Sequence, residues 1–378
     1  MKFEIIREAD WISRHQTEID GFRKKADFDN HYFAGPWLQV WFERQIPVTV
    51  PVLLIVLDTH GSLVGFWPFV ERPGILGSKG LWPYVYDEAN YFHPICLQSA
   101  ITERVTGLKS LLGEFLFCWI PLMKDSFWYH FSNTPIKNGK YLSISRSPRK
   151  TALLIPQEET EFKDFWDQQA GSKSRKSFRY DQKALSKKGK ISIQNYSTFK
   201  EIRSVMPVTC VVEVESWKSK EGAGLYTVRG KRGFFFELLP ELAEQENARV
   251  AILSLDDQPI AWQVELLSSG NLGIHHLAFD QRWKKYSPGK QLLHHQISLA
   301  WKEGRTIDFL PGNFEYKEKI SARVESVHEF HWFKRSIRGF LARRLILGNI
   351  KLRQKIRQNS GKTKMSKTMK EILEEKNG

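Results

Sequence analysis

Residues 271–302 restrict the fold more than any other segment of this chain. They read as a strand, NLGIHHLAF, then a polar connection that ends in YSPGK, and then a helix with its apolar residues on one side. Ser287 occupies the expected N-cap and Pro288 the first helical position, where a missing N–H group costs nothing. A strand that leads into a helix N-terminus fixes where the backbone N–H groups of that helix are presented.

The turn between this strand and helix has the features of an anion site. Gly289 has no side chain to block the helix N-terminus. The N–H groups of Gly289, Lys290 and Gln291 are expected to point outward at the positive end of the helix dipole. Lys284, Lys285 and Lys290 add full charges. The sequence therefore predicts binding of a phosphate-like group. The alternative is a helix start that is simply well capped.

Basic residues are distributed unevenly along the sequence, which has a net charge of +15. Residues 173–190 hold eight Lys and Arg against Asp181 alone, and residues 338–378 hold twelve against three Glu. Such blocks indicate an acidic partner, whether nucleic acid, an anionic membrane surface or a phosphorylated substrate, and a solvated helix face is the alternative. The C-terminal block also contains Leu, Ile and Met, so it fits a basic amphipathic helix on anionic lipid or a solubilising tail.

Several other classes of protein are disfavoured. The N-terminus, MKFEIIREADW, has acidic residues and no apolar stretch, unlike a signal peptide. The apolar run near residues 48–57 is too short to span a bilayer. Cys96, Cys118 and Cys210 lie far apart, and no Cys or His spacing suggests a metal site. We therefore expect a cytoplasmic protein with thiols in its core and no bound metal.

Two similar hairpins indicate how the chain is organised. LLIVLDTHGSLVGFWPF and AILSLDDQPIAWQVEL each combine an apolar strand, an acid-led polar turn and a return strand, which hints at duplication, although any antiparallel hairpin shares this pattern. A chain of 378 residues is expected to form two domains, and the stretch NTPIKNGKYLSISRSPRK predicts a boundary near its end. The predicted parts are domains at residues 1–150 and 151–337 and a basic tail at residues 338–378.

Residues 275–322, HHLAFDQRWKKYSPGKQLLHHQISLAWKEGRTIDFLPGNFEYKEKISA, resemble the GNAT-type acetyltransferases associated with cellulose and exopolysaccharide biosynthesis. The shared pattern is a Tyr-Ser-Pro-Gly turn, an Asp-Phe strand, a Gly and then Tyr-Lys. RKSFRYDQKALSKKGKISIQ and ESWKSKEGAGL match the same family, and AGPWLQVW and GSLVGFWPF fit its first half. Related Fem-type aminoacyl transferases carry two GNAT-like units in one chain. The resemblance therefore implies an α+β fold of two GNAT-like units, each a mixed sheet flanked by helices.

The resemblance also implies an acyl-CoA co-substrate, with acetyl-CoA as the expected donor, whose pyrophosphate rests on the turn before the central helix. The implied binding residues are Lys285, Ser287, Gly289, Lys290 and Gln291. The usual GNAT turn is Gln/Arg-x-x-Gly-x-Gly/Ala, and only Gly289 of that pattern remains here. The phosphate contact is therefore expected to come from backbone N–H groups.

GNAT chemistry is a direct attack of an amine or hydroxyl on the thioester, so the protein must accept a proton and stabilise the departing thiolate. The resemblance implies Tyr316 as the general acid to the thiolate, with Lys317 as an alternative that binds the thiolate or an anionic substrate group. Asp308, an acid inside an apolar strand, is predicted to be a base or to orient the substrate. Glu215 is a second candidate base. A structural role is the alternative for each.

Glu213, Glu215 and Trp217 in VVEVESWKSKEGAGL fit the acceptor side of the family, and His276 is also predicted to bind the substrate. Trp217 fits a stacking wall for a sugar ring. His275 and His276 alternate along one strand, so at most one is expected to face the site, and a structural histidine is the alternative for both.

Three functions follow from these features. The first is an acyl-CoA-dependent N- or O-acyltransferase for a small molecule or glycan precursor, such as a cell-envelope or exopolysaccharide intermediate. It is expected in the cytoplasm or at the inner membrane face, with its basic tail against anionic lipid. The second is a Fem-like transferase that uses aminoacyl-tRNA, which the basic patches would suit. The third is a non-catalytic module that binds membranes or nucleic acid.

Overall fold

The computed structural model describes residues 1–8, 10–27, 30–45, 49–84, 89–124, 141–157, 160–228, 231–311 and 321–352. Tyr316, Lys317 and most of the basic tail lie outside these residues. None of the described helices is long and apolar enough to cross a membrane.

The first half of the chain begins with a strand and short helices and continues as a strand meander. Its strands are β1 (Lys2–Ile6), β2 (Val50–Leu57), β3 (Leu63–Pro73), β4 (Lys79–Pro83), β5 (Ile95–Cys96), β6 (Phe117–Lys124) and β7 (Tyr141–Leu154). Its α-helices are α1 (Trp11–Arg14), α2 (Gln16–Arg23), α3 (Gly35–Gln45) and α4 (Ile101–Glu114). Short 3-10 helices occur at His31–Phe33, Ile75–Gly77 and Gln98–Ala100.

The second half repeats this alternation with longer helices. Its strands are β8 (Ile191–Tyr196), β9 (Ala248–Leu255), β10 (Gln258–Ser268), β11 (Asn271–Phe279), β12 (Thr306–Asp308) and β13 (Arg323–Lys334). Its helices are α6 (Phe162–Gln169), α7 (Ser172–Ser186), α8 (Phe199–Val214), α9 (Trp217–Lys220), α10 (Lys231–Glu244) and α11 (Pro288–Lys302), with a 3-10 helix at Gln281–Tyr286. A last helix spans residues 337–352. The predicted strand and helix at 271–302 are confirmed.

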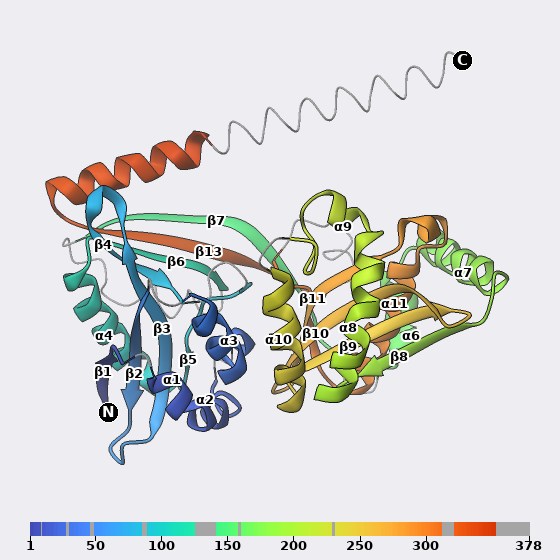
Figure 1. Ribbon diagram of the computed structural model, residues 1–378, viewed down its shortest axis with the longest axis horizontal. Helices are drawn as coiled ribbons and strands as arrows, with labels where there is room; N and C mark the ends of the chain where they lie inside the picture. Colours follow the sequence, from blue (N-terminus) through green and yellow to red (C-terminus); the bar gives the residue numbers. More distant parts are fainter. Residues whose placement is uncertain are drawn as a thin grey trace.

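Within the described residues, thirteen strands form one mixed sheet that extends through both halves (Figure 1). Its order is β1-β2-β3-β4-β6-β13-β7-β12-β11-β10-β9-β8, and β5 pairs with β3. Each half has four antiparallel strands, then a helix, then a strand that pairs in parallel with the fourth: β4 with β6 across α4, and β11 with β12 across α11. The same strand order therefore occurs twice, as duplication of one unit would produce.

The two halves exchange their last strands. β13 pairs with β6 of the first half, β7 pairs with β12 of the second, and β7 and β13 pair with each other. Each half therefore completes the sheet of the other. The domain boundary near residue 150 stays a prediction, and β7 runs across it.

Residues 141–150, which belong to the turn-rich stretch near the predicted boundary, are part of strand β7. Pro148 explains how a turn-rich stretch can be a strand. It lies where the register between β7 and β13 shifts, because Val327 pairs with Arg149 whereas Glu329 pairs with Arg146. An irregular step of this kind tolerates a residue that has no N–H group to donate.

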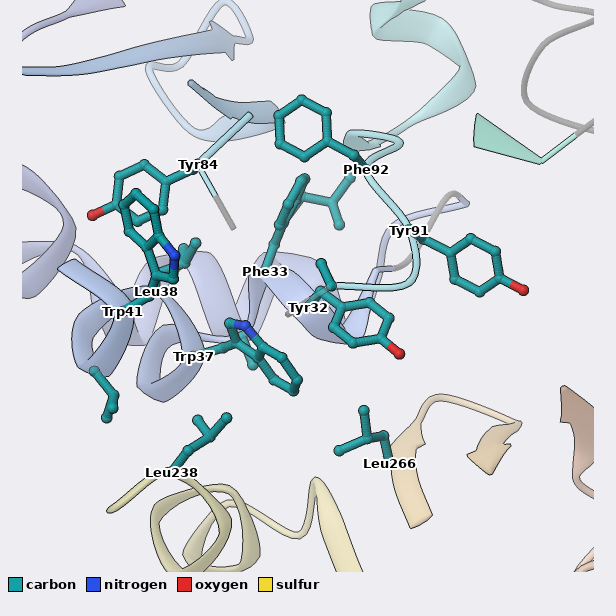
Figure 2. Packing of buried hydrophobic residues seen from close by; sticks show 14 of the residues in the cluster. Tyr32, Phe33, Trp37, Leu38, Trp41, Tyr84, Tyr91, Phe92, Leu238 and Leu266 are labelled. Carbon is teal, nitrogen blue, oxygen red and sulfur yellow. The ribbon is translucent and has the colours of Figure 1, made fainter. Parts of the chain in front are cut away.

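A shared aromatic core joins the two halves. Figure 2 shows Tyr32 and Trp37 packed near Leu238 and Leu266, which come from α10 and β10. Trp37 is fully buried and meets the rings of Phe234 and Phe235 edge-on, at centroid distances of 5.9 and 6.3 Å. Because apolar burial is the main driving force of folding, we expect the two halves to fold together.

Candidate active site

A cavity of about 810 Å³ lies where β11 and β12 separate. The two strands pair only through residues 271–273 and 306–308, so the sheet opens beyond that point. The lining includes both histidines of β11, the first turn of α11, residues 309–311 after β12, and side chains from α6 and α9. The cavity therefore joins the predicted anion-binding turn to the predicted acceptor residues.

His275 and His276 both line this cavity, whereas the sequence predicted that at most one could face the site. The reason is a bulge in β11. Val264 pairs with His276 and Glu265 with Ile274, so His275 has no partner across the strand. A bulge breaks the strict alternation of side chains and redirects them, and bulges are frequent beside active sites.

His276 lies between a carboxylate and an ammonium group. Its Nε2 is 3.1 Å from Glu213 Oε1, and its Nδ1 is 3.3 Å from Lys218 Nζ. Because a lysine ammonium can only donate, we assign the proton to Nε2 and the lone pair to Nδ1. Burial, together with the charges of Lys218 and Lys231, lowers the pKa of His276 well below its ordinary value. The imidazole is therefore neutral at neutral pH.

Glu213 is held in place by the backbone that follows α9. Its fully buried carboxylate accepts hydrogen bonds from the N–H groups of Leu225 and Tyr226. Burial raises the pKa of Glu213, and these two hydrogen bonds and the Lys218 charge oppose the rise. This places a buried carboxylate 3.1 Å from His276 Nε2, although the two groups do not have hydrogen-bond geometry.

Glu215, the base candidate suggested by the sequence, occupies a different environment. It is exposed at the C-cap of α8 and is not part of the cavity lining, whereas Trp217 and Lys218 of the next helix are. Glu213 is two positions earlier and faces inward. In the sequence, Glu213 stands out because it is a carboxylate within the apolar stretch VVEV. A carboxylate is costly to bury without partners.

His275 belongs to a cluster from both halves of the chain. Its Nδ1 is 3.4 Å from Tyr32 Oη and 3.4 Å from Asn90 Nδ2, and its ring meets Trp37 edge-on. Burial lowers the pKa of His275 to about 3. Its packing between aromatic rings fits the structural role that the sequence left open.

The turn before α11 differs in detail from its prediction. Ser287 adopts a left-handed conformation with φ of 52°, and its hydroxyl donates to Asp181 of α7 at 2.9 Å instead of capping the helix. The N–H groups of Lys290 and Gln291 donate to the Ser287 carbonyl, so the expectation that they are free is wrong. Within the described residues, the Gly289 N–H has no backbone acceptor, and Gly289 and Lys290 line the cavity.

Gly289 is also required by packing. A Cβ atom at this position would lie 2.9 Å from the ring of Phe279 on β11.

Lys285 and Gln291, two further predicted CoA-binding residues, have local partners. Gln291 is buried and donates to the Tyr286 carbonyl at 2.9 Å, and Lys285 Nζ lies 4.9 Å from the centre of the Tyr286 ring.

Asp308 is buried at the end of β12, beside the cavity but not in its lining. Its carboxylate accepts hydrogen bonds from Lys124 Nζ at 2.6 Å, Thr151 Oγ1 at 2.7 Å and the Leu310 N–H at 2.8 Å, and Tyr91 Oη is 2.9 Å away. Burial by itself would raise the pKa of Asp308, but Lys124 and these hydrogen bonds hold it below its ordinary value. Because its oxygens already accept from these donors and it does not line the cavity, Asp308 is poorly placed to take a proton from a substrate.

The described residues contain no group of His, Cys, Asp or Glu that could hold a metal ion. Tyr316, the predicted general acid, and Lys317, its alternative, lie outside the described part of the chain. Their roles stay predictions.

Comparison with known proteins identifies the fold. Residues 172–318 match the family described as acetyltransferase (GNAT) domain. Curated protein sequences give no significant match. Among solved structures, FemX aligns with a TM-score of 0.62 and 9% identity over 87% of this chain and 97% of its own. The C-terminal domain of a putative lysylphosphatidylglycerol synthetase from Agrobacterium fabrum aligns with a TM-score of 0.54 and 10% identity, over 90% of this chain and 96% of its own.

A conserved protein of unknown function from Bacteroides thetaiotaomicron aligns with a TM-score of 0.55 and 9% identity, over 88% of this chain and 100% of its own. At such low identity these structures indicate the fold alone, and they share it over most of the chain. The matched domain covers the cavity-forming strands and helix α11, and a GNAT domain implies acyl-CoA as co-substrate. Residues 172–318 therefore match a GNAT acetyltransferase domain, which supports an acyltransferase, and the chain has an α+β fold of two GNAT-like units.

Proposed function

We propose that this protein transfers an acyl group, acetyl in the simplest case, from coenzyme A to an amine or hydroxyl of a sugar-containing envelope or exopolysaccharide intermediate. The cavity is the observation that carries this proposal. Its lining includes the N-terminus of α11 with Lys290, the neutral imidazole of His276, and the side chains of Trp166 and Trp217. A phosphate-bearing donor and a ring-shaped acceptor each meet suitable chemistry there.

The turn before α11 suits the pyrophosphate of the donor. The Gly289 N–H lies at the positive end of a 15-residue helix, and Lys290 adds a full charge beside it. Glycine at this position also lets the helix start approach Phe279 of β11 closely. In this proposal Lys285, Ser287 and Gln291 shape the turn, because none of them lines the cavity, and Ser287 and Gln291 already have hydrogen-bond partners.

His276 is the base in this proposal. The acceptor amine or hydroxyl attacks the thioester carbonyl, and its proton passes to His276 Nδ1, whose lone pair faces Lys218 before the acceptor arrives. The charge of the Glu213 carboxylate, 3.1 Å from Nε2, stabilises the imidazolium that forms. Tyr316, with Lys317 as the alternative, remains the proposed proton donor to the departing thiolate.

The acceptor is proposed from the aromatic lining. Trp166 and Trp217 both contribute to the cavity wall, and tryptophan rings pack well against the apolar faces of sugars. Lys218 beside Trp217 suits an anionic group on the acceptor, such as a phosphate or carboxylate.

Titration with acetyl-CoA tests the donor, with Lys290→Gln and Lys302→Gln as matched variants. Both lysines belong to α11, but Lys302 lies at the other end of the helix, roughly 18 Å away at 1.5 Å per residue. Loss of one phosphate contact should weaken CoA binding about tenfold in Lys290→Gln, while Lys302→Gln should bind like the unmodified protein.

Equal weakening in both variants, or none in either, would contradict the proposed pyrophosphate site. Salt-sensitive binding of tRNA without any binding of acetyl-CoA would instead favour the Fem-like alternative, because tRNA contacts depend on phosphate neutralisation. Release of free thiol from acetyl-CoA in the presence of amino sugars and nucleotide sugars then tests the acceptor.

A further inference from the structure

The helix at residues 337–352 has apolar side chains on two opposite sides. On its inner side Ala342 is fully buried against Phe117 and Phe333, which lie at the ends of β6 and β13. Ile346 packs on the same cluster. This side accounts for why the helix is docked on the sheet. A helix that packs only on this sheet needs only polar residues on its outer side.

The outer side of this helix carries five large apolar side chains instead. Ile337, Leu341, Leu345 and Leu352 recur at helical spacing along one stripe, with Phe340 beside it. Their exposed fractions are 83% for Ile337, 46% for Phe340, 47% for Leu341, 50% for Leu345 and 56% for Leu352. Single exposed apolar residues are ordinary, but a continuous stripe of them marks an interaction site.

Positive charge flanks this stripe. Arg338, Arg344 and Lys351 are exposed on the same helix, and residues 335–352 contain no Asp or Glu. Figure 1 shows the helix on the outside of the molecule, above β4 and β7 and away from α7 and α11. A partner on this side would lie away from α11, whose first turn lines the cavity.

We propose that the helix at residues 337–352 lies on an anionic membrane surface, with Ile337, Leu341, Leu345 and Leu352 in the acyl-chain boundary and the flanking cations at the lipid phosphates. Charge complementarity favours this partner over the others. A second copy would bring two cationic helices together, and nucleic acid would leave the apolar stripe in water. An interfacial helix with these two features binds lipid through burial and charge together.

Co-sedimentation of the full-length protein with vesicles tests this proposal. One set of vesicles is phosphatidylcholine alone, and the other contains one quarter phosphatidylglycerol. The test variant is Leu341→Glu/Leu345→Glu, and the matched control is Val211→Glu/Val214→Glu on α8, whose valines are 66% and 55% exposed. All four positions are solvent-accessible, so neither variant should disturb the core, which far-UV circular dichroism checks.

The unmodified protein and the α8 control should bind the anionic vesicles, and the bound fraction should fall with salt. Leu341→Glu/Leu345→Glu should lower the partition coefficient by about tenfold or more, because it places two anions where apolar burial is required. No binding to anionic vesicles, or equal binding by both variants, would overturn the proposal. So would self-association, seen in sedimentation velocity, that Leu341→Glu/Leu345→Glu abolishes without any vesicle binding.

Discussion

Replacement of Asp308 by Asn should destabilise the fold far more than it slows acyl transfer. The carboxylate links four segments of the chain through Lys124 of β6, Thr151 of β7, Tyr91 and its own backbone after β12. Lys124 and Asp308 are 184 residues apart, and their side chains are only 21% and 7% exposed. An amide keeps the shape but presents no charge to the lysine.

Loss of one partner of a buried ion pair usually costs about 3–5 kcal/mol. Lys124 retains some access to water, so we expect the lower end, about 3 kcal/mol, out of a total stability of roughly 5–15 kcal/mol. Asp308→Asn combined with Lys124→Met should recover at least half of this loss, because no unpaired charge is then left buried. Asp257→Asn, in an exposed turn, should change stability by less than about 0.5 kcal/mol.

Lys124→Met on its own should leave the Asp308 carboxylate buried without its cationic partner. Without the lysine, burial should raise the pKa of Asp308 above that of the unfolded chain. A group with a raised pKa in the folded state stabilises below the unfolded pKa and loses that contribution as the pH rises. The stability deficit of Lys124→Met relative to the unmodified protein should therefore be larger at pH 7 than at pH 4.

Urea unfolding followed by circular dichroism gives the four free energies of the cycle, and thiol release from acetyl-CoA gives kcat. We expect kcat of Asp308→Asn to stay within about tenfold, since the carboxylate does not line the cavity. Unchanged unfolding together with a loss of kcat of a hundredfold or more would refute this reasoning. It would restore the catalytic role that the sequence suggested for Asp308.

Two predictions concern the histidines. His276→Gln should lower kcat by about 10²–10⁴-fold, and Glu213→Gln combined with it should lower kcat little further, because the two act as one unit; additive losses in initial rates would contradict the pairing. His275 has its pKa lowered from 6.5 to about 3 in the folded protein, so its contribution to stability is present above pH 6.5 and is lost as the pH falls toward 3. Between these pH values, the free energy of unfolding of His275→Gln, measured by urea titration, should therefore fall less steeply with falling pH than that of the unmodified protein. The same pH dependence in both proteins would show that His275 is not the cause.

The sequence by itself determined most of the local structure, because that depends on neighbours in the chain. The periodic apolar positions and the Ser-Pro-Gly turn predicted a strand over 271–279 and a helix ending at Lys302, and the structure has both. Both hairpins were predicted from alternating strands around polar turns and are confirmed. Residues 141–150 belong to a Pro- and Ser-rich stretch that predicted a domain boundary, and their pairing as β7 depends on partners that lie far away in the chain.

Only the tertiary structure decided how these elements combine. The exchange of β7 and β13 joins residues from opposite halves, and no local periodicity encodes which distant strand a segment will pair with. The pairing of Glu213 with His276 arises because α8 and β11 meet beside a bulge. Asp308 was singled out correctly as a costly buried acid, but its lysine partner 184 residues earlier was not visible. Partners that neutralise a buried charge are set by packing, and packing is a property of the whole chain.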